Sequence, residues 1–171
     1  MGKMNKKAQY YIFAAVVLLG YAFLIIRPAV QAGAETSAFK SLYENFISES
    51  PVIINNALYS SSNLSEDYKA FADEFISFAK TRSPNFRLVY LLAENDNLVV
   101  GNRLDIGINL TASSIPYTLA SNSELTIPKP ASASVIIGKR AYEFSFDERD
   151  IQAKFLFRNA DRKEVRVYVQ D

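Results

Sequence analysis

Residues 103–111 read RLDIGINLT, and this stretch shows most clearly which kind of fold the second half of the chain adopts. Its apolar residues occupy every second position, and they are Leu104, Ile106, Ile108 and Leu110. A period of two places these side chains on one face of an extended chain and the polar residues on the other. The stretch therefore predicts a β-strand with one buried face.

Further segments after Pro84 show the same alternation, or a short apolar run typical of a buried strand. They cover residues 86–93, 98–100, 135–137, 142–146, 155–157 and 165–169. The turn-rich RNADRK between the last two segments predicts a terminal hairpin. The segment TIPKPAS, residues 126–132, is expected to cross between sheets or to bound an edge, because proline cannot donate a ladder hydrogen bond. About seven short strands are typical of a small antiparallel β-sandwich or a strongly curved sheet.

Before Pro84 the apolar residues recur with the 3.6-residue period of amphipathic helices. A first helix is predicted from the spacing of Phe39, Leu42, Tyr43, Phe46 and Ile47. Ser50-Pro51 predicts a new start, because serine caps helices and proline fits their first turn. A third helix is predicted between a Ser65 cap and Ser83-Pro84, with an apolar face made of Tyr68, Phe71, Phe75, Phe78 and Ala79. We expect that aromatic face to pack on the sheet.

One long apolar run precedes these helices. No residue from Tyr10 to Ile26 is charged, and as a helix the run would span about 25 Å, close to the ~30 Å of a bilayer core. Several lysines precede the run, whereas only Arg27 and Lys40 follow it closely. The positive-inside rule therefore places the N-terminus in the cytoplasm and everything after Pro28 outside the membrane.

Three interpretations of this run are open. A secretory signal peptide would be cut at small residues, which Ala32-Gly33-Ala34 provide, although the run is longer than the usual core of such a peptide. A plain membrane anchor would keep the whole segment. In the third interpretation, the sequence Lys6-Lys7-Ala8-Gln9 directly before the run resembles the class III signal peptide of archaeal type IV pilin-like proteins.

This resemblance implies cleavage of the Ala8–Gln9 bond, with the apolar helix kept on the mature protein. In that family the helix packs in a filament core or holds the subunit in the membrane. Many pilins carry a glutamate five residues into the mature chain, where this sequence has Phe13. The order of anchor, helices and a strand-rich C-terminal part is also similar to that of uncharacterised single-span surface proteins of archaea.

A stripe of alanines in the anchor bears on assembly. The residues Ala8, Ala15, Ala22 and Ala29 recur every seven positions, so they share one side of a helix. Small residues let helices approach closely in lipid, where packing drives association. The stripe therefore predicts a helix-packing surface, although alanine is also common in membrane helices that do not associate.

Composition limits the chemistry that this chain can perform. The net charge is +1, and the chain has no cysteine and no histidine. These absences remove thiolate zinc sites, cysteine nucleophiles and every mechanism built on imidazole. Two acidic clusters remain, Glu94 with Asp96 and Asp147 with Glu148 and Asp150, and neither has the spacing of a known calcium loop. We expect no enzymatic activity, no cofactor and no nucleic-acid partner.

Two glycosylation sequons fit an exported domain. They are Asn63-Leu64-Ser65, in a polar loop, and Asn109-Leu110-Thr111, in the alternating strand with the asparagine on its outward side. Asn63 and Asn109 are therefore possible sites of N-glycosylation. Ser65 serves equally well as a helix cap.

The sequence as a whole predicts an α+β protein: an N-terminal transmembrane helix, two to three amphipathic helices, and a small antiparallel β-sandwich or curved sheet. The expected divisions are residues 1–28, 29–84 and 85–171. We expect a non-enzymatic, single-pass surface protein that contacts the lipid bilayer and is a pilin-like subunit, with possible self-assembly through its N-terminal helix. The alternative is a membrane-tethered binding or scaffold module that does not assemble.

Overall fold

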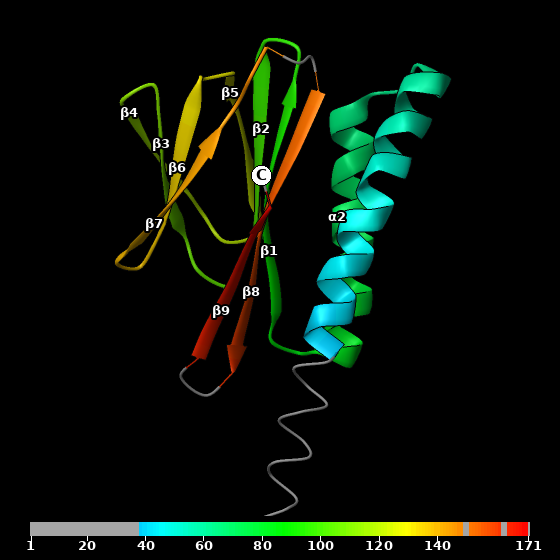
Figure 1. Cartoon of the computed structure of the whole chain (residues 1–171), viewed down its shortest axis with the longest axis vertical. Coiled ribbons are helices and arrows are strands. Elements are labelled where there is room, and N and C mark those ends of the chain that lie inside the picture. Colours follow the sequence, from blue (N-terminus) through cyan, green and yellow to red (C-terminus); the bar gives the residue numbers. More distant parts are fainter. Residues whose placement is uncertain (1–37, 149–150, 162–163, 171) are drawn as a thin grey trace, which may run out of the picture. The chain divides into compact units, whose positions relative to one another are not determined.

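The computed structural model describes residues 38–148, 151–161 and 164–170, with side chains described as far as Asn159. Contacts divide the chain after Lys40, and the unit that follows, Ser41–Asp171, contains all the strands described below. It is α+β, as predicted, with a pair of helices followed by antiparallel strands (Figure 1). The predicted transmembrane helix lies outside the described residues. Within them, no helix is both long and apolar enough to cross a bilayer.

Residues 38–60 form one helix, and Leu64–Arg82 form the next, α2. The predicted restart at Ser50-Pro51 is wrong, because the helix continues through Pro51. Proline removes one backbone hydrogen bond from a helix. Here a buried hydrogen bond of 2.5 Å between the hydroxyls of Ser50 and Tyr68 ties the residue before the proline to α2, which offsets that loss.

The ends of α2 follow from its capping residues. The N-cap is Asn63 rather than the predicted Ser65, and the Asn63 side chain accepts a hydrogen bond from a backbone N–H of the first turn. Asparagine caps helices as well as serine does, and here the Asn63 side chain, two residues before Ser65, is the one that accepts from the free backbone N–H of Glu66. The helix ends at Arg82 with Ser83 as C-cap, which confirms the stop predicted at Ser83-Pro84.

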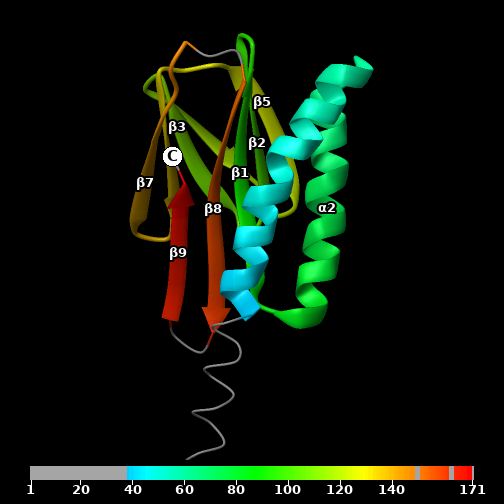
Figure 2. The ribbon, with the colours of Figure 1, turned by 45° about the vertical axis from the view of Figure 1, so that its right-hand side comes forward.

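The strands form two antiparallel sheets. One has five strands in the order β5-β2-β1-β8-β9, and the other has four in the order β4-β3-β6-β7. The bounds are β1 Phe86–Glu94, β2 Asn97–Arg103, β3 Ile108–Ala112, β4 Ile115–Leu119, β5 Ser123–Pro128, β6 Ser132–Ile137, β7 Arg140–Ser145, β8 Ile151–Asp161 and β9 Glu164–Gln170. The sheets face each other, and the helices cover the other side of the five-stranded sheet (Figures 1 and 2). The predicted sandwich and its terminal hairpin, β8–β9, are confirmed.

The strand predicted over residues 103–111 is divided in two. Strand β2 ends at Arg103 and β3 begins at Ile108, so the chain leaves the five-stranded sheet and enters the four-stranded sheet within this stretch. Ile106 is 43% exposed although it keeps the alternating pattern. Within this stretch only Ile108 and Leu110 alternate in a strand, β3, whereas Leu104 and Ile106 lie in the bend before it. Leu104, Ile108 and Leu110 are all buried in one core.

A buried asparagine holds this bend in place. The Asn102 amide donates hydrogen bonds to the carbonyl oxygens of Ile106, at 2.9 Å, and Ala120, at 2.8 Å. Its carbonyl oxygen accepts from the backbone N–H of Leu104 at 3.0 Å. Both polar ends of a buried side chain are thus paired, as burial requires, and the bend joins the two sheets.

The connection from β5 to β6 crosses between the sheets, as predicted for TIPKPAS. Strand β5 is an edge strand that ends at Pro128. Proline has no N–H to donate, and the end of an edge strand tolerates it without the loss of a ladder hydrogen bond. Strands β4 and β5 themselves were not predicted. Most of their side chains are exposed or half-buried, so they carry little of the buried alternation by which strands are recognised.

Two cores share the central strand β1. The core between the sheets is mainly aliphatic, and β1 contributes Val89, Leu91 and Ala93 to it. The alternate residues of β1 face the helices, where Phe86 packs on Phe75 and Tyr90 packs on Tyr68. Because β1 is covered on both sides, none of its residues is exposed and the strand reads as a nearly continuous apolar run.

The core between the helices and the five-stranded sheet is aromatic. At its centre Phe46 is fully buried, and its ring lies 4.9–6.4 Å from the rings of Tyr68, Phe71, Phe75, Phe155 and Phe157. The expectation that the aromatic face of α2 packs on the sheet is confirmed for Phe75. It is wrong for Phe78, which is 47% exposed at the margin of that face, with the Arg82 guanidinium 5.1 Å from its ring.

Candidate functional site

The residues predicted to take part in processing and helix packing all lie outside the described residues. They are Lys6, Lys7, Ala8, Gln9, Ala15, Ala22 and Ala29. Their roles therefore stay predictions.

The two sequon asparagines are both described and both exposed, as an acceptor for a glycan must be. Asn63 is the N-cap of α2, so its side-chain oxygen is occupied by a backbone N–H. Asn109 lies on β3, and its side-chain oxygen accepts a hydrogen bond of 3.2 Å from Thr118. Their glycosylation stays a prediction.

The described members of the two acidic clusters lie in or beside turns, and the structure does not join them into a site; Asp150 lies outside the described residues. Glu94 and Asp96 flank the β1–β2 turn, where Glu94 accepts a hydrogen bond of 3.1 Å from the Ser65 hydroxyl. Asp147 accepts from the amide of Gln152 at 2.5 Å. Within residues 38–148, 151–161 and 164–170, no three potential metal ligands come together.

A polar cluster that the sequence did not predict lies where α2 crosses β2 and β5. Arg103, the last residue of β2, is only 5% exposed. Its Nε donates to Asp73 of α2 at 2.5 Å, and its Nη2 donates to Glu124 of β5 at 2.6 Å. A buried guanidinium needs such partners, and these two carboxylates connect a helix to the edge of the sheet.

Tyr90 of β1 extends this cluster into the aromatic core. Its hydroxyl donates to the Glu124 carboxylate, and the Arg103 guanidinium lies 5.6 Å from the centre of its ring. The ring crosses β2 at Gly101, where a Cβ would overlap it. An isolated glycine within a strand often marks such a close approach, so Gly101 was the one signal in the sequence that pointed to this place.

The cluster shifts the pKa of its members in a consistent direction. Burial, together with the hydrogen bond to Glu124, raises the pKa of Tyr90 well above its usual range. Burial alone would lower the pKa of Arg103, but its carboxylate partners outweigh burial and raise it. Near neutral pH the Arg103 guanidinium is therefore charged and the Tyr90 phenol keeps its proton. Neither group is suited to transfer a proton in a reaction.

A cavity of about 380 Å³ opens beside the cluster. It is lined by Lys69, Asp73, Ile76, Ser77, Lys80, Arg103, Asn122, Ser123 and Glu124. The Lys69 ammonium lies 3.6 Å from Glu124, so charges of both signs meet at the rim. The lining offers hydrogen-bond donors and acceptors to a small polar molecule. Both of its carboxylates are already engaged by Arg103, which leaves them poor candidates for holding a metal ion.

No family model, no curated protein and no solved structure matches the chain.

Proposed function

We propose that this protein is a single-pass membrane protein, a pilin-like subunit or surface component, that displays its α+β unit outside the membrane. The observation that carries the proposal is the order of Lys6-Lys7-Ala8-Gln9, an uncharged apolar run from Tyr10 to Ile26, and a compact sandwich unit after it. The leader is cut between Ala8 and Gln9. The apolar helix then holds the mature protein in the membrane.

Self-assembly through the anchor is part of this proposal. The part of the alanine stripe that stays on the mature chain after cleavage, Ala15, Ala22 and Ala29, lets the anchors of neighbouring subunits approach closely. Phe13 replaces the glutamate that many pilins carry, so the packing of the anchors rests on small residues and not on a buried charge.

The experiment is mass analysis of the N-terminus of protein extracted from native membranes. We expect a mature chain that begins at Gln9 and is retained in the membrane fraction. The variant Ala8→Leu should block cleavage, because the peptidase of that family cuts after a small residue, whereas the control Ala14→Leu should be processed normally. A chain that begins at Met1 or Gly2 contradicts the pilin-like proposal, and soluble protein that begins at Glu35 shows a secretory signal peptide instead.

A tethered binding module is the second candidate, and the cavity beside Arg103 is the observation that favours it. In such a module the anchor only holds the domain at the surface, and the polar lining binds a small molecule. A protein that stays monomeric in the membrane, with or without leader cleavage, distinguishes this candidate from the pilin-like subunit.

A further inference from the structure

The strands and helices of the folded unit run between two ends that carry different charges. Helix α2 ends and β1 begins at one end, and β2 ends there too, because Leu88 of β1 pairs with Arg103 of β2. The β6–β7 turn lies at the same end, since β6 runs antiparallel to β3, which begins just after the bend that follows β2. The β1–β2 turn and the start of α2 lie at the other end, where the Ser65 hydroxyl donates to Glu94.

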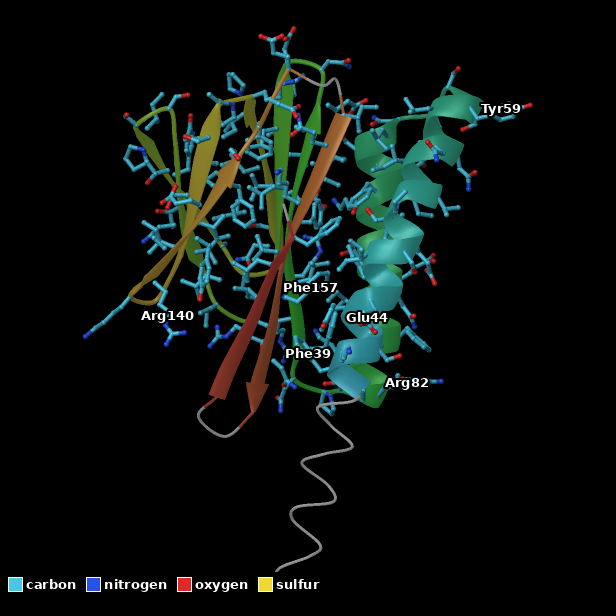
Figure 3. All side chains as sticks on the ribbon, in the orientation of Figure 1. Phe39, Glu44, Tyr59, Arg82, Arg140 and Phe157 are labelled. Atoms are coloured by element: carbon cyan, nitrogen blue, oxygen red, sulfur yellow. The ribbon has the colours of Figure 1, made fainter. Side chains whose placement is uncertain are left out.

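The first of these ends is basic. Four cations lie there in exposed or half-buried positions, two in the last turn of α2 and two at the β6–β7 turn, and they are Lys80, Arg82, Lys139 and Arg140. None of the four forms an ion pair with a residue that the structure describes. Figure 3 shows Arg82 and Arg140 towards this end and Tyr59 towards the other. We call the four residues the basic end.

Most carboxylates near the basic end are already engaged by arginine. Arg87 holds Asp105 at 2.5 Å, and Arg103 holds the two carboxylates of the cluster described above. The other acids near this end of the described chain are Glu44, Asp161 and Glu164. In the sequence Arg162 and Lys163 stand between the last two, so the β8–β9 turn segment has no net charge. The four cations of the basic end therefore keep their positive charge largely uncompensated.

The opposite end of the unit is acidic. The first turn of α2, the β1–β2 turn and the segment after β7 meet there, and their acids are Glu66, Asp67, Glu94, Asp96, Asp147 and Glu148. We call these six residues the acidic end. Near an anionic surface, a unit whose charges are separated in this way turns its basic end towards the surface and its acidic end away.

The chain enters the unit at the basic end. Tyr43, close to the start of the first helix, packs on Phe157, and Phe157 pairs with Leu88 beside Arg103. Residues 27–40 separate this entry from the apolar run. Even when fully extended they span at most about 50 Å, so the proposed anchor holds the basic end close to the membrane surface.

We infer that the basic end docks on the anionic headgroups of the membrane that holds the anchor. Its lysines and arginines lie against lipid phosphates, and Ile106, 43% exposed in the bend at the same end, lies against the interface. This inference rests on the anchor of the proposed function and deepens it, because it names what the folded unit contacts outside the membrane. A second copy fits less well, since anchors in one membrane hold all basic ends at the same height, away from the acidic ends of their neighbours.

The test uses the full-length protein with Thr81→Cys, reconstituted in vesicles of phosphatidylcholine with or without phosphatidylglycerol. A bimane dye on this cysteine, the only one in the chain, reports contact with the bilayer through quenching by nitroxide-labelled headgroups. Thr81 is exposed beside Arg82, and Ala131→Cys, exposed between β5 and β6 at the acidic end, is the matched control. We expect quenching at Thr81 and not at Ala131, only in the anionic vesicles. It should disappear at about 1 M salt, where charges are screened within about 3 Å.

Removal of charge tests the chemistry of the contact. Lys80→Gln with Arg82→Gln, or Lys139→Gln with Arg140→Gln, should each lower the ratio of docked to undocked protein about tenfold or more, because each cation near an anionic surface contributes to binding. Asn55→Asp with Asn56→Asp changes the net charge by the same amount on the exposed side of the first helix, near the acidic end, and should leave the ratio unchanged.

Three results overturn the inference. They are equal quenching at Thr81 and Ala131, quenching that is as strong in neutral vesicles as in anionic ones, and quenching that survives both neutralised pairs. Disulfide linkage between Thr81→Cys and Ala131→Cys chains also overturns it, because the acidic end of a second copy would then occupy the basic end.

The failure of this inference differs from that of the proposed function. If alkaline carbonate does not extract the full-length chain from native membranes and the Thr81 dye is still not quenched, only the lipid contact is wrong. A chain that alkaline carbonate releases refutes the proposed anchor itself.

Discussion

Phe46 is the residue on which the aromatic core depends most. It is fully buried, and the rings around it come from α2 and from β8. We expect Phe46→Ala to lower the free energy of unfolding by about 3–5 kcal/mol, because it removes buried apolar surface and leaves a cavity that rigid neighbours cannot fill. Urea unfolding of residues 29–171 measures this change.

Phe78→Ala is the matched control for Phe46→Ala. The Phe78 ring belongs to the same aromatic series but is 47% exposed, so its removal should cost about 1 kcal/mol or less. Equal losses in the two variants would mean that Phe46 is not the centre of the core.

Two buried tyrosines predict a loss of stability in alkaline solution. Burial raises the pKa of Tyr68 above its ordinary value of 10.0, and the hydrogen bond with Ser50 only partly opposes this. The pKa of Tyr90 is raised too, by burial and by Glu124. The unfolded chain therefore loses these protons first, so their contribution to stability is complete below about pH 10 and falls above it, by about 1.4 kcal/mol per pH unit for each tyrosine.

The measurement is the free energy of unfolding of residues 29–171 between pH 9 and pH 11, expressed per unit of pH. Tyr68→Phe should reduce the total loss of stability between pH 9 and pH 11 by about 1.4 kcal/mol, because the share of one tyrosine in the slope is small at pH 9 and approaches about 1.4 kcal/mol per pH unit above pH 10. A variant with the parent's slope would show that the Tyr68 hydroxyl ionises equally easily in the folded and unfolded chains.

The Arg103 cluster shows why a site of this kind is hard to predict from sequence. Asp73, Arg103 and Glu124 are far apart in the chain, and only the pairing of β2 with β5 beneath α2 brings them together. Each looks like an ordinary surface charge in its own segment. Gly101 could have marked the place, because glycine inside a strand often signals a close approach, but it does not say which residue approaches.

At the scale of elements, the helix pair acts as the cover of the five-stranded sheet. The side of that sheet that faces the helices carries large buried residues, among them Phe86, Tyr90 and Phe157. Residues 85–171 alone would expose this surface, so we expect that fragment to aggregate or to bind a hydrophobic dye. Residues 29–171 should do neither, since the helices bury the surface.

Size-exclusion chromatography and dye fluorescence of the two fragments, at equal concentration, check this expectation. A monomeric fragment 85–171 that does not bind dye would contradict it, because the sandwich would then be stable without its helical cover.

Most elements could be predicted because their residues bury one face with a clear period. The alternation at Tyr142 and Phe144 belongs to β7, and the apolar run after Asn85 belongs to β1. The period could not show where residues 103–111 leave one sheet for the other, since that bend depends on the partners of Asn102 in a distant loop. The edge strands β4 and β5 were not predicted because most of their side chains are exposed or half-buried and each strand contains a proline. Their residues therefore do not show a clear period of two.

At the scale of the whole molecule, the apolar run and the folded unit are suited to different surroundings, lipid for the run and water for the unit. The run from Tyr10 to Ile26 has the composition of a segment that leaves water, and the unit after Lys40 buries its own apolar surface in two cores. A domain with closed cores needs the membrane only for attachment. Both candidate functions, the pilin-like subunit and the tethered binding module, therefore share one central claim, which is that this unit lies outside the cell membrane.

Labelling of Thr118→Cys tests that claim most directly. Thr118 is exposed on β4, and the chain has no other cysteine, so a membrane-impermeant maleimide reports only this position. We predict that intact cells label the full-length variant as completely as lysed cells do. Labelling that appears only after lysis would place the domain inside the cell and contradict the account.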